Sequence, residues 1–212
     1  LNAVEKGQDL NVSGTSANLA EGTVVTVTLN GKNYTATTAA DGTWSLTVPA
    51  ADLAGLGQAN YTLNATATNG VGNSVSNSAN LLVDTALPTV TINTVAGDNV
   101  INAAEVAAGQ TISGSVANAE AGNTVTVMIG GNSYTATVQS DLSWSVSVPE
   151  SVLTALGNGD LTVSATVTNG HGNTGTGERD ITIDANLPGL RVDTVAGDDV
   201  INSIEHGQNL IV

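Results

Sequence analysis

The stretch Tyr61–Thr68, which reads YTLNATAT, decides the fold of this chain. Its residues alternate, so that Tyr61 and the apolar residues share one face while Thr and Asn take the other. The same alternation returns 100 residues later in Leu161–Thr168, which reads LTVSATVT. The pattern therefore predicts a half-buried β-strand that occurs twice.

The whole sequence repeats with this period of 100 residues. The block Leu1–Glu5 (LNAVE) returns as Ile101–Glu105 (INAAE) and as Ile201–Glu205 (INSIE). A unit of this length is large enough to be an independent domain with its own core. The period predicts three segments, with the boundaries 1–87, 88–187 and 188–212. We expect the first repeat to lack its opening strand, the second to be complete and the third to be only a start.

Short alternating segments, separated by turn signals such as Gly130-Gly131, fill the complete repeat. We expect seven strands in it, near residues 89–93, 110–117, 123–129, 132–138, 143–148, 160–168 and 177–184. One short helical turn is expected at Glu150–Gly157, where Leu153 and Leu156 are three residues apart, and no other helix. The chain is thus predicted to be all-β, with tandem Ig-like antiparallel β-sandwiches of about 100 residues and seven strands each.

The composition limits the partners of the chain. Lys and Arg total 4 against 19 Asp and Glu, and the net charge of −15 leaves nothing to neutralise nucleic-acid phosphates. The same charge disfavours anionic lipid and favours cations. No apolar run approaches the length of about 18 residues that a membrane span needs. The absence of cysteine excludes a disulfide framework.

Acidic residues gather in the loop after the first strand of each repeat. This loop reads GDNVINAAE in Gly97–Glu105 and GDDVINSIE in Gly197–Glu205. An Asp, an Asn four residues later and a Glu seven residues later match positions 5 to 12 of an EF-hand calcium loop. Positions 1 and 3 would be Thr94 and Ala96, which carry no carboxylate. The loop therefore predicts half of a calcium site, and other segments must supply the remaining oxygens.

The expected topology brings these loops to the joints between repeats. The seventh strand ends at Asp84 or Asp184, beside the acidic loop, whereas the loop Asn169–Asn173 lies at the other end of its sandwich. Stacked repeats then gather oxygens in numbers that suit calcium. The predicted calcium ligands are Asn2, Glu5, Asp84, Asp98, Asn102, Glu105, Asp184, Asp193, Asp198, Asn202 and Glu205. Asn169 and Asn173 are further candidates. The alternative is that these residues form Asx turns and solvated acidic loops.

No set of residues predicts catalysis. His171 and His206 have no counterparts in the other copies and are expected on the surface without a role. No Ser/His/Asp set recurs, and a nucleophile needs a base beside it, so the chain is not expected to be an enzyme. The few aromatic residues, Trp44 and Trp144 among them, lie on inward faces and are expected in the core rather than in a sugar-binding surface.

Four motifs carry a resemblance to a known family. They are Asp84–Pro88 (DTALP), Gly97–Glu105 (GDNVINAAE), Asp41–Ser45 (DGTWS) and Thr68–Asn73 (TNGVGN). With these motifs the chain resembles the bacterial Ig-like repeats of giant Bap-type and RTX-type biofilm and host-cell adhesins of Gram-negative bacteria. The resemblance implies repeats that calcium stiffens, in an extracellular rod on the bacterial cell surface, exported without disulfides. Such relatives often carry Asp where this chain has Asn69 and Asn169.

Two functions are compatible with these observations. The first is a structural stalk segment of a cell-surface adhesin, in which calcium fixes the angle between neighbouring repeats. The alternative is a binding module whose repeats make homotypic, glycan or ice contacts. In the homotypic form, calcium would bridge sheet edges and acidic faces of repeats on two cells. The chain ends raise a separate expectation, in which residues 189–193 of one molecule fill the open first-strand place of another.

Overall fold

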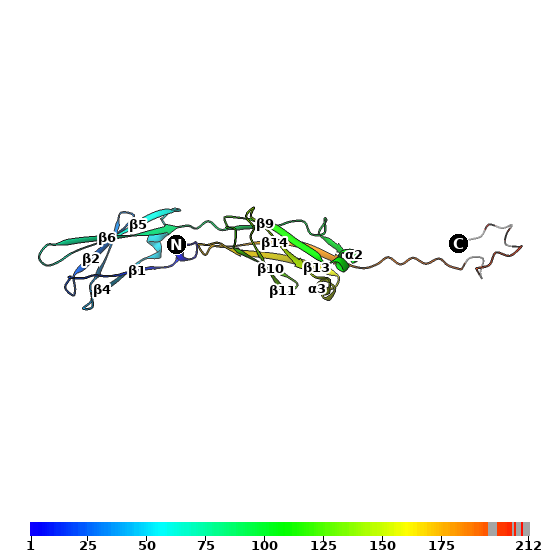
Figure 1. Cartoon of the computed structure of the whole chain (residues 1–212), viewed down its shortest axis with the longest axis horizontal. Helices are drawn as coiled ribbons and strands as arrows, with labels where there is room; N and C mark the ends of the chain where they lie inside the picture. The colour runs from blue at the N-terminus through cyan, green and yellow to red at the C-terminus, as the bar shows by residue number, and fades with distance from the viewer. Residues whose placement is uncertain (195–198, 205, 207–208, 210–212) are drawn as a thin grey trace.

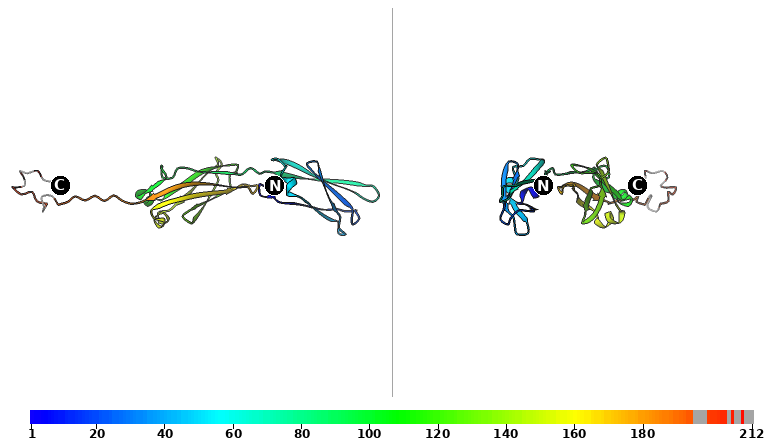
Figure 2. Two further views of the ribbon diagram at one scale, coloured as in Figure 1. Left: turned by 180° about the vertical axis from the view of Figure 1, so that it is seen from behind. Right: turned by 60° about the vertical axis from the view of Figure 1, so that its left-hand side comes forward.

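The chain folds into two β-sandwiches that lie end to end in the computed structural model (Figure 1). The structure describes residues 1–194, 199–204, 206 and 209. Further views agree that the two sandwiches and an extended C-terminal segment follow one another along one long axis (Figure 2). The predicted all-β fold is confirmed. Among the described residues, no helix is long and apolar enough to cross a membrane.

The first sandwich lies within residues 1–87, all of which are described, and has six strands in two sheets. One sheet has the order β3-β2-β5-β6, and the other contains only β1 and β4. Its elements are η1 (Glu5–Gly7), β1 (Leu10–Thr15), β2 (Val24–Leu29), β3 (Lys32–Thr37), β4 (Thr43–Val48), α1 (Ala50–Leu53), β5 (Ala59–Thr68) and β6 (Ser74–Val83).

The second sandwich, within the fully described residues 88–187, has eight strands. Its sheets have the orders β11-β10-β13-β14-β8 and β12-β9-β7. Its elements are β7 (Thr89–Ile92), β8 (Val100–Asn102), α2 (Ala103–Ala108), β9 (Gln110–Ala117), β10 (Thr124–Ile129), β11 (Asn132–Thr137), β12 (Ser143–Val148), α3 (Glu150–Leu156), β13 (Gly159–Thr168) and β14 (Thr174–Asp184).

The strands form where the sequence alternates. Along β13, Val163, Ala165 and Val167 are buried, while Thr162 and Thr168 on the other face are exposed. This is the period of two that a half-buried strand requires. The seven strands expected in the complete repeat are all present, and the last of them begins earlier than expected, at Thr174.

Two elements of the second sandwich were not expected. β8 is a three-residue strand that pairs in parallel with β14 and places Ile101 opposite Ile183. α2 follows directly and begins after Asn102, which caps it. The expectation of no helix outside Glu150–Gly157 is therefore wrong. The Asn-x-x-Glu spacing that suggested a calcium loop is also that of a capping box, which starts a helix.

The two sandwiches differ most in one strand. β7 pairs with β9 and places Val90 and Ile92, which are 7% and 4% exposed, in the same core as Trp144. Among the described residues, β1 pairs with β4 alone, so the place that corresponds to β7 beside it is open. Trp144 is 1% exposed, whereas its counterpart Trp44 is only half-buried. Among the described residues, the first core is therefore less completely covered than the second.

Candidate functional site

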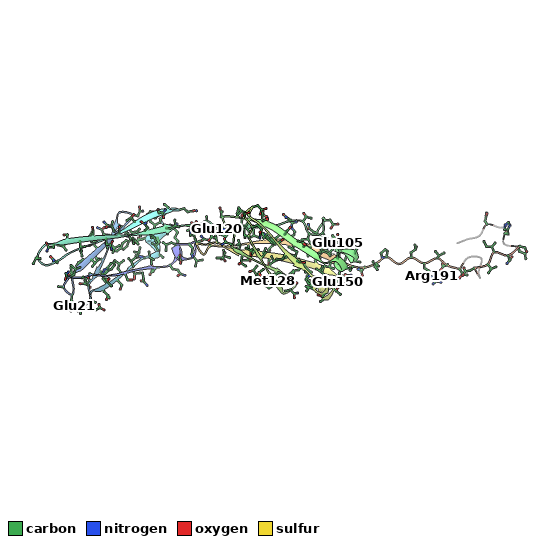
Figure 3. The ribbon with its side chains drawn as sticks, in the orientation of Figure 1. Glu21, Glu105, Glu120, Met128, Glu150 and Arg191 are labelled. Carbon is green, nitrogen blue, oxygen red and sulfur yellow. The ribbon has the colours of Figure 1, made fainter. Side chains whose placement is uncertain are left out.

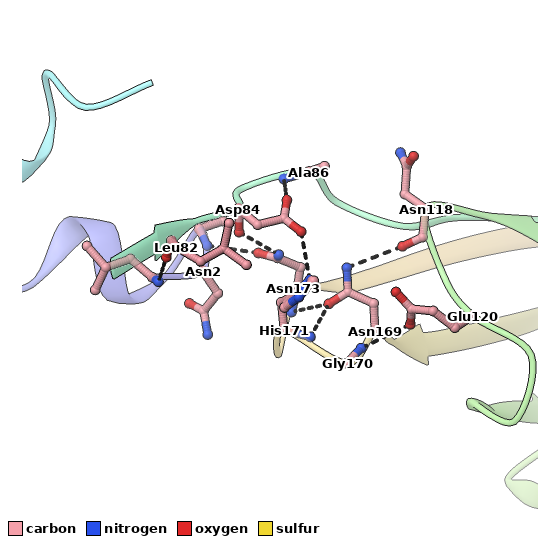
Figure 4. Close-up of polar contacts among 12 residues, drawn as sticks. Asn2, Leu82, Asp84, Ala86, Asn118, Glu120, Asn169, Gly170, His171 and Asn173 are labelled. Carbon is pink, nitrogen blue, oxygen red and sulfur yellow. Dashed lines mark hydrogen bonds and ion pairs between the residues drawn. The ribbon is translucent and has the colours of Figure 1, made fainter. Parts of the chain in front are cut away.

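The joint between the two sandwiches is built around Asp84, the residue that follows β6. The loop between β13 and β14 projects from the second sandwich towards it (Figure 4). The Asn173 side chain in this loop donates a hydrogen bond to the Asp84 carbonyl at 2.8 Å. Its Oδ1 accepts a hydrogen bond from the Ala3 amide, also at 2.8 Å. One side chain that is only 2% exposed thus connects two segments of the first sandwich to the second.

The asparagines of this loop fix its conformation. Asn169 Oδ1 accepts hydrogen bonds from the amides of His171 and Asn173 at 3.1 and 3.0 Å. Its Nδ2 donates to the Asn118 carbonyl at 3.2 Å. Asn169 is 7% exposed, and its side-chain oxygen and nitrogen both have partners inside the second sandwich. The contacts of Asn173 with Ala3 and Asp84 confirm the predicted topology at this joint, in which the loop meets the preceding repeat.

His171 lies on the surface, as expected, with its side chain 47% exposed, but it also contacts the joint, which was not expected. Its Nδ1 lies 2.7 Å from Oδ2 of Asp84. The other carboxylate oxygen, Oδ1, accepts a hydrogen bond from the Ala86 amide at 3.0 Å. Comparison of the repeats gave no signal for this contact, because Val71 occupies the corresponding place. The position of His171 in a loop that was expected at a joint was the signal available.

The Asn-x-x-Glu motifs of the first two repeats form capping boxes. Asn2 Oδ1 accepts hydrogen bonds from the amides of Val4 and Glu5 at 2.9 and 2.8 Å. Glu5 Oε2 in turn accepts one from the Asn2 amide at 2.9 Å. Asn102 and Glu105 make the corresponding contacts at the start of α2. In each box, Oε1 of the glutamate has no hydrogen-bond partner within the described part of the chain.

The far end of the second sandwich carries the equivalent residues. Asn102 is the register partner of Asp184 where β8 pairs with β14, and Glu105 lies at the same end (Figure 3). Asp184 Oδ1 accepts hydrogen bonds from the backbone and side-chain amides of Asn186, at 3.2 and 2.8 Å. Asp98 Oδ1 accepts one from the Val100 amide at 2.9 Å, which is an Asx turn before β8.

The ligands predicted in the third repeat are described only in part. Asp193 pairs with Arg191 at 3.1 Å in the extended segment. Asn202 Oδ1 accepts a hydrogen bond from the Ile204 amide at 2.9 Å. Asp198 and Glu205 lie outside the described residues.

The donors at both ends of the second sandwich fit calcium in kind, because carboxylate and amide oxygens are its preferred ligands. Among the described residues, however, no group of three or more His, Cys, Asp or Glu side chains that could hold a metal occurs. At the first joint, both oxygens of Asp84 already have partners. A calcium site here would therefore need a changed side-chain arrangement and oxygens from more than one segment.

The family of the chain follows from its likeness to known proteins. The model of the bacterial Ig-like domain matches residues 10–85, which is most of the first sandwich. A solved structure from a 1.5-MDa bacterial ice-binding adhesin is 32% identical and covers 96% of this chain, with a TM-score of 0.55; the match spans 67% of that structure. The chain belongs to the bacterial Ig-like family. The resemblance carried by Asp84–Pro88 and Gly97–Glu105 is thereby confirmed.

A second solved structure is that of a Ca²⁺-stabilised adhesin that helps an Antarctic bacterium reach out and bind ice. It is 34% identical over 96% of this chain, with a TM-score of 0.59. The match covers 51% of that structure, so the chain spans about half of its length. No curated protein matches the chain.

Proposed function

We propose that the chain is a stalk segment of a large cell-surface adhesin, with its bacterial Ig-like repeats outside the cell. The joint supports this proposal most directly. Asn173 is buried, and its partners Ala3 and Asp84 belong to the other sandwich. A different angle between the sandwiches would leave this amide and its partners without hydrogen bonds, which is costly for a buried group. A joint that favours one angle suits a stalk, because a stalk has to hold an extended shape.

We also propose that calcium adds to this stiffness. The related Ca²⁺-stabilised adhesin supports the choice of ion. In this chain Glu5, Asp98, Glu105 and Asp184 each keep one carboxylate oxygen without a hydrogen-bond partner among the described residues. When bound, calcium would neutralise carboxylates that otherwise repel one another. The proposed ligands at the first joint are Asn2, Glu5 and Asp84. At the second joint they are Asp98, Asn102, Glu105, Asp184, Asp193, Asp198, Asn202 and Glu205.

The two joints are not equivalent in this proposal. At the first, the contact between His171 and Asp84 already places a basic group beside the carboxylate. Calcium would have to compete with His171 for Asp84. At the second, Asp184 keeps its Oδ2 without a partner among the described residues. We therefore expect the second joint to account for the larger share of calcium binding.

Thermal melts in millimolar calcium and in excess EDTA test the proposal. A ligand that binds only the folded state raises the midpoint by mass action. We expect the calcium-dependent rise to shrink in E105Q/D184N more than in E5Q/D84N. The matched control E21Q/E178Q removes two exposed carboxylates away from both joints and should keep the full rise. Identical melts of the unaltered chain in calcium and EDTA would remove calcium from the proposal and leave the hydrogen-bonded joint alone.

A further inference from the structure

His171 and Asn173 contact the same residue of the first sandwich. The Asn173 side chain donates to the Asp84 carbonyl at 2.8 Å, and His171 Nδ1 lies 2.7 Å from Oδ2 of the Asp84 carboxylate. One contact uses the backbone of Asp84 and the other its side chain (Figure 4). Both start from the loop between β13 and β14, so a change in the angle between the sandwiches has to lengthen them together.

The contact between His171 and Asp84 does not require a charged imidazole. Both the neutral ring with its hydrogen on Nδ1 and the imidazolium donate a hydrogen bond from this atom. The side chains of His171 and Asp84 are 47% and 25% exposed, so water screens the pair and it adds little to folding stability. It nevertheless joins two separate sandwiches, and its effect is therefore on the angle between them.

The same contact occupies the carboxylate that calcium would need at this joint. Asp84 Oδ1 accepts a hydrogen bond from the Ala86 amide at 3.0 Å, and Oδ2 has His171 beside it. Calcium binds carboxylate oxygens at about 2.3–2.6 Å, so an ion at Oδ2 has to displace the imidazole. His171 thus supplies Asp84 with the partner that calcium would otherwise supply.

The first sandwich shows that the loop keeps its shape without the histidine. In the loop between β5 and β6, Asn69 Oδ1 accepts hydrogen bonds from the amides of Val71 and Asn73 at 3.2 and 2.9 Å. Asn169 makes the two corresponding contacts in the second sandwich, at 3.1 and 3.0 Å. Only the side chain at the middle position differs, with Val71 in one loop and His171 in the other. The histidine is therefore not needed to form the loop.

A second residue that the first sandwich lacks holds the loop of the second sandwich from behind. Glu120 Oε2 accepts a hydrogen bond from the Gly170 amide at 3.2 Å (Figure 4). In the first sandwich, Ala20 occupies the position of Glu120. The second sandwich thus has one additional side chain that supports the loop, Glu120, and one that extends from the loop to the neighbouring sandwich, His171.

We propose that His171 is a positioning residue that holds the first joint at its angle in the absence of calcium. The inference rests on the proposed stalk function and on Asp84 as a calcium ligand. At this joint His171 and calcium compete for one carboxylate, and either of them fixes it. The joint therefore keeps its angle whether or not calcium is present, whereas the same joint with valine at position 171 becomes stiff only when calcium binds.

Distances between two spin labels, measured in EDTA at one fixed pH, test the proposal. The chain has no cysteine, so S45C and S145C place one label on an exposed position of β4 and one on the corresponding position of β12. We expect a narrow distribution of distances in the otherwise unaltered chain and a broad one in H171V. H171N should keep the distribution narrow, because the side-chain nitrogen of asparagine is as many bonds from Cα as Nδ1 of histidine.

The matched control is V71H, which adds a histidine to the equivalent loop of the first sandwich, at the end away from the joint (Figure 1). It should leave the distribution in EDTA unchanged. Thermal melts of H171V and V71H should match those of the unaltered chain, because both side chains are exposed and neither forms part of a core. In saturating calcium, the distribution of H171V should become narrow again.

Calcium affinity separates competition for Asp84 from a general loosening of the joint. Isothermal titration calorimetry is carried out on E105Q/D184N, so that the second joint contributes less to binding. Adding H171V should raise the remaining affinity by a factor on the order of ten, because calcium no longer displaces a hydrogen bond from the carboxylate. A joint that had only been loosened would bind calcium more weakly.

Three results would overturn the proposal. The first is a distribution for H171V in EDTA that is as narrow as that of the unaltered chain, which would mean that Asn173 holds the joint alone. The second is an unaltered chain that is already broad in EDTA. If calcium then narrows it, the proposed calcium-stiffened stalk stands and only the role of His171 fails; if it stays broad in calcium, the proposed function fails as well. The third is a calcium affinity that H171V leaves unchanged or lowers, which would exclude competition for Asp84.

Discussion

The two sandwiches have nearly the same sequence pattern, yet the described parts of their cores differ by more than the side chains of one strand. Among the described residues, 22 apolar side chains are buried in the core of the second and 10 in that of the first. β7 supplies only Val90 and Ile92. In the first sandwich no described strand corresponds to β7, and there Trp44, Leu63 and Ala65 are also only half-buried. An edge strand in a small sandwich therefore contributes in two ways: it buries its own apolar side chains, and it also covers apolar side chains of the neighbouring strands.

The largest expected effect concerns the two tryptophans. We expect calorimetry to show two transitions, the lower from the first sandwich and the upper from the second. W144A should lower the stability of the second sandwich by about 3–5 kcal/mol, because it empties a fully buried position. W44A should cost the first sandwich only about 1 kcal/mol, because its ring is already only half-buried. Equal losses would contradict the comparison.

The next prediction exchanges one pair of corresponding residues, Gly177 and Asn77, between the two sandwiches. G177N gives the second sandwich the residue that the first has at this position. Its Cβ would lie 2.1 Å from the Val90 carbonyl oxygen, so β7 must move away. We expect a loss of about 1–3 kcal/mol in the upper transition, with faster amide exchange along β7 and β9. N77G, the reverse exchange, should change the lower transition little. Unchanged exchange along β7 in G177N would show that the strand does not depend on this glycine.

The capping boxes provide a smaller difference. N102A removes the cap of α2, a six-residue helix, and should cost about 1 kcal/mol in the second sandwich. N2A should cost the first sandwich less, because η1 is only a three-residue 3₁₀ turn. Urea denaturation with EDTA present measures both without a contribution from calcium. A loss for N2A as large as that for N102A would mean that Asn2 acts mainly through the joint.

The strands could be predicted from the sequence because alternation of side chains is a local property. β8 and α2 could not, for two reasons. A three-residue strand is too short to show a period, and Asn102 with Glu105 has a spacing that suits a capping box and a calcium loop alike. The contact between His171 and Asp84 depends on how two sandwiches stack, which no local pattern describes. Asn173 was predicted at the joint because topology alone decides which loop faces the preceding repeat.

The smallest expected effect is a dependence on pH that comes from Asp52 and its partners, which only the first sandwich has. Lys32 Nζ lies 2.5 Å from Asp52 Oδ1, and Tyr34 donates to Oδ2 at 3.0 Å. These hydrogen bonds, that from Lys32 first, lower the pKa of Asp52 below its ordinary value of 3.8. The pair therefore stabilises the folded state above that pH, and the stabilisation is lost as the pH falls through the lowered pKa.

Melts of the unaltered chain and of D52N between pH 2 and pH 6 measure this effect. The lower transitions should differ slightly at pH 6 and converge as the pH falls. The upper transition is the internal control, since Asn132 and Val152 occupy the corresponding positions. A difference that grows towards low pH would contradict the assignment.

Small-angle X-ray scattering tests most directly the central claim, that the joint holds the two sandwiches as one extended unit. In saturating calcium, we expect the data to fit a single end-to-end arrangement, and E5Q/D84N in EDTA to need a wider range of angles between the sandwiches. Data that require a broad range of angles in the calcium-saturated chain would contradict the account, because a flexible joint cannot serve as a stalk segment of fixed shape.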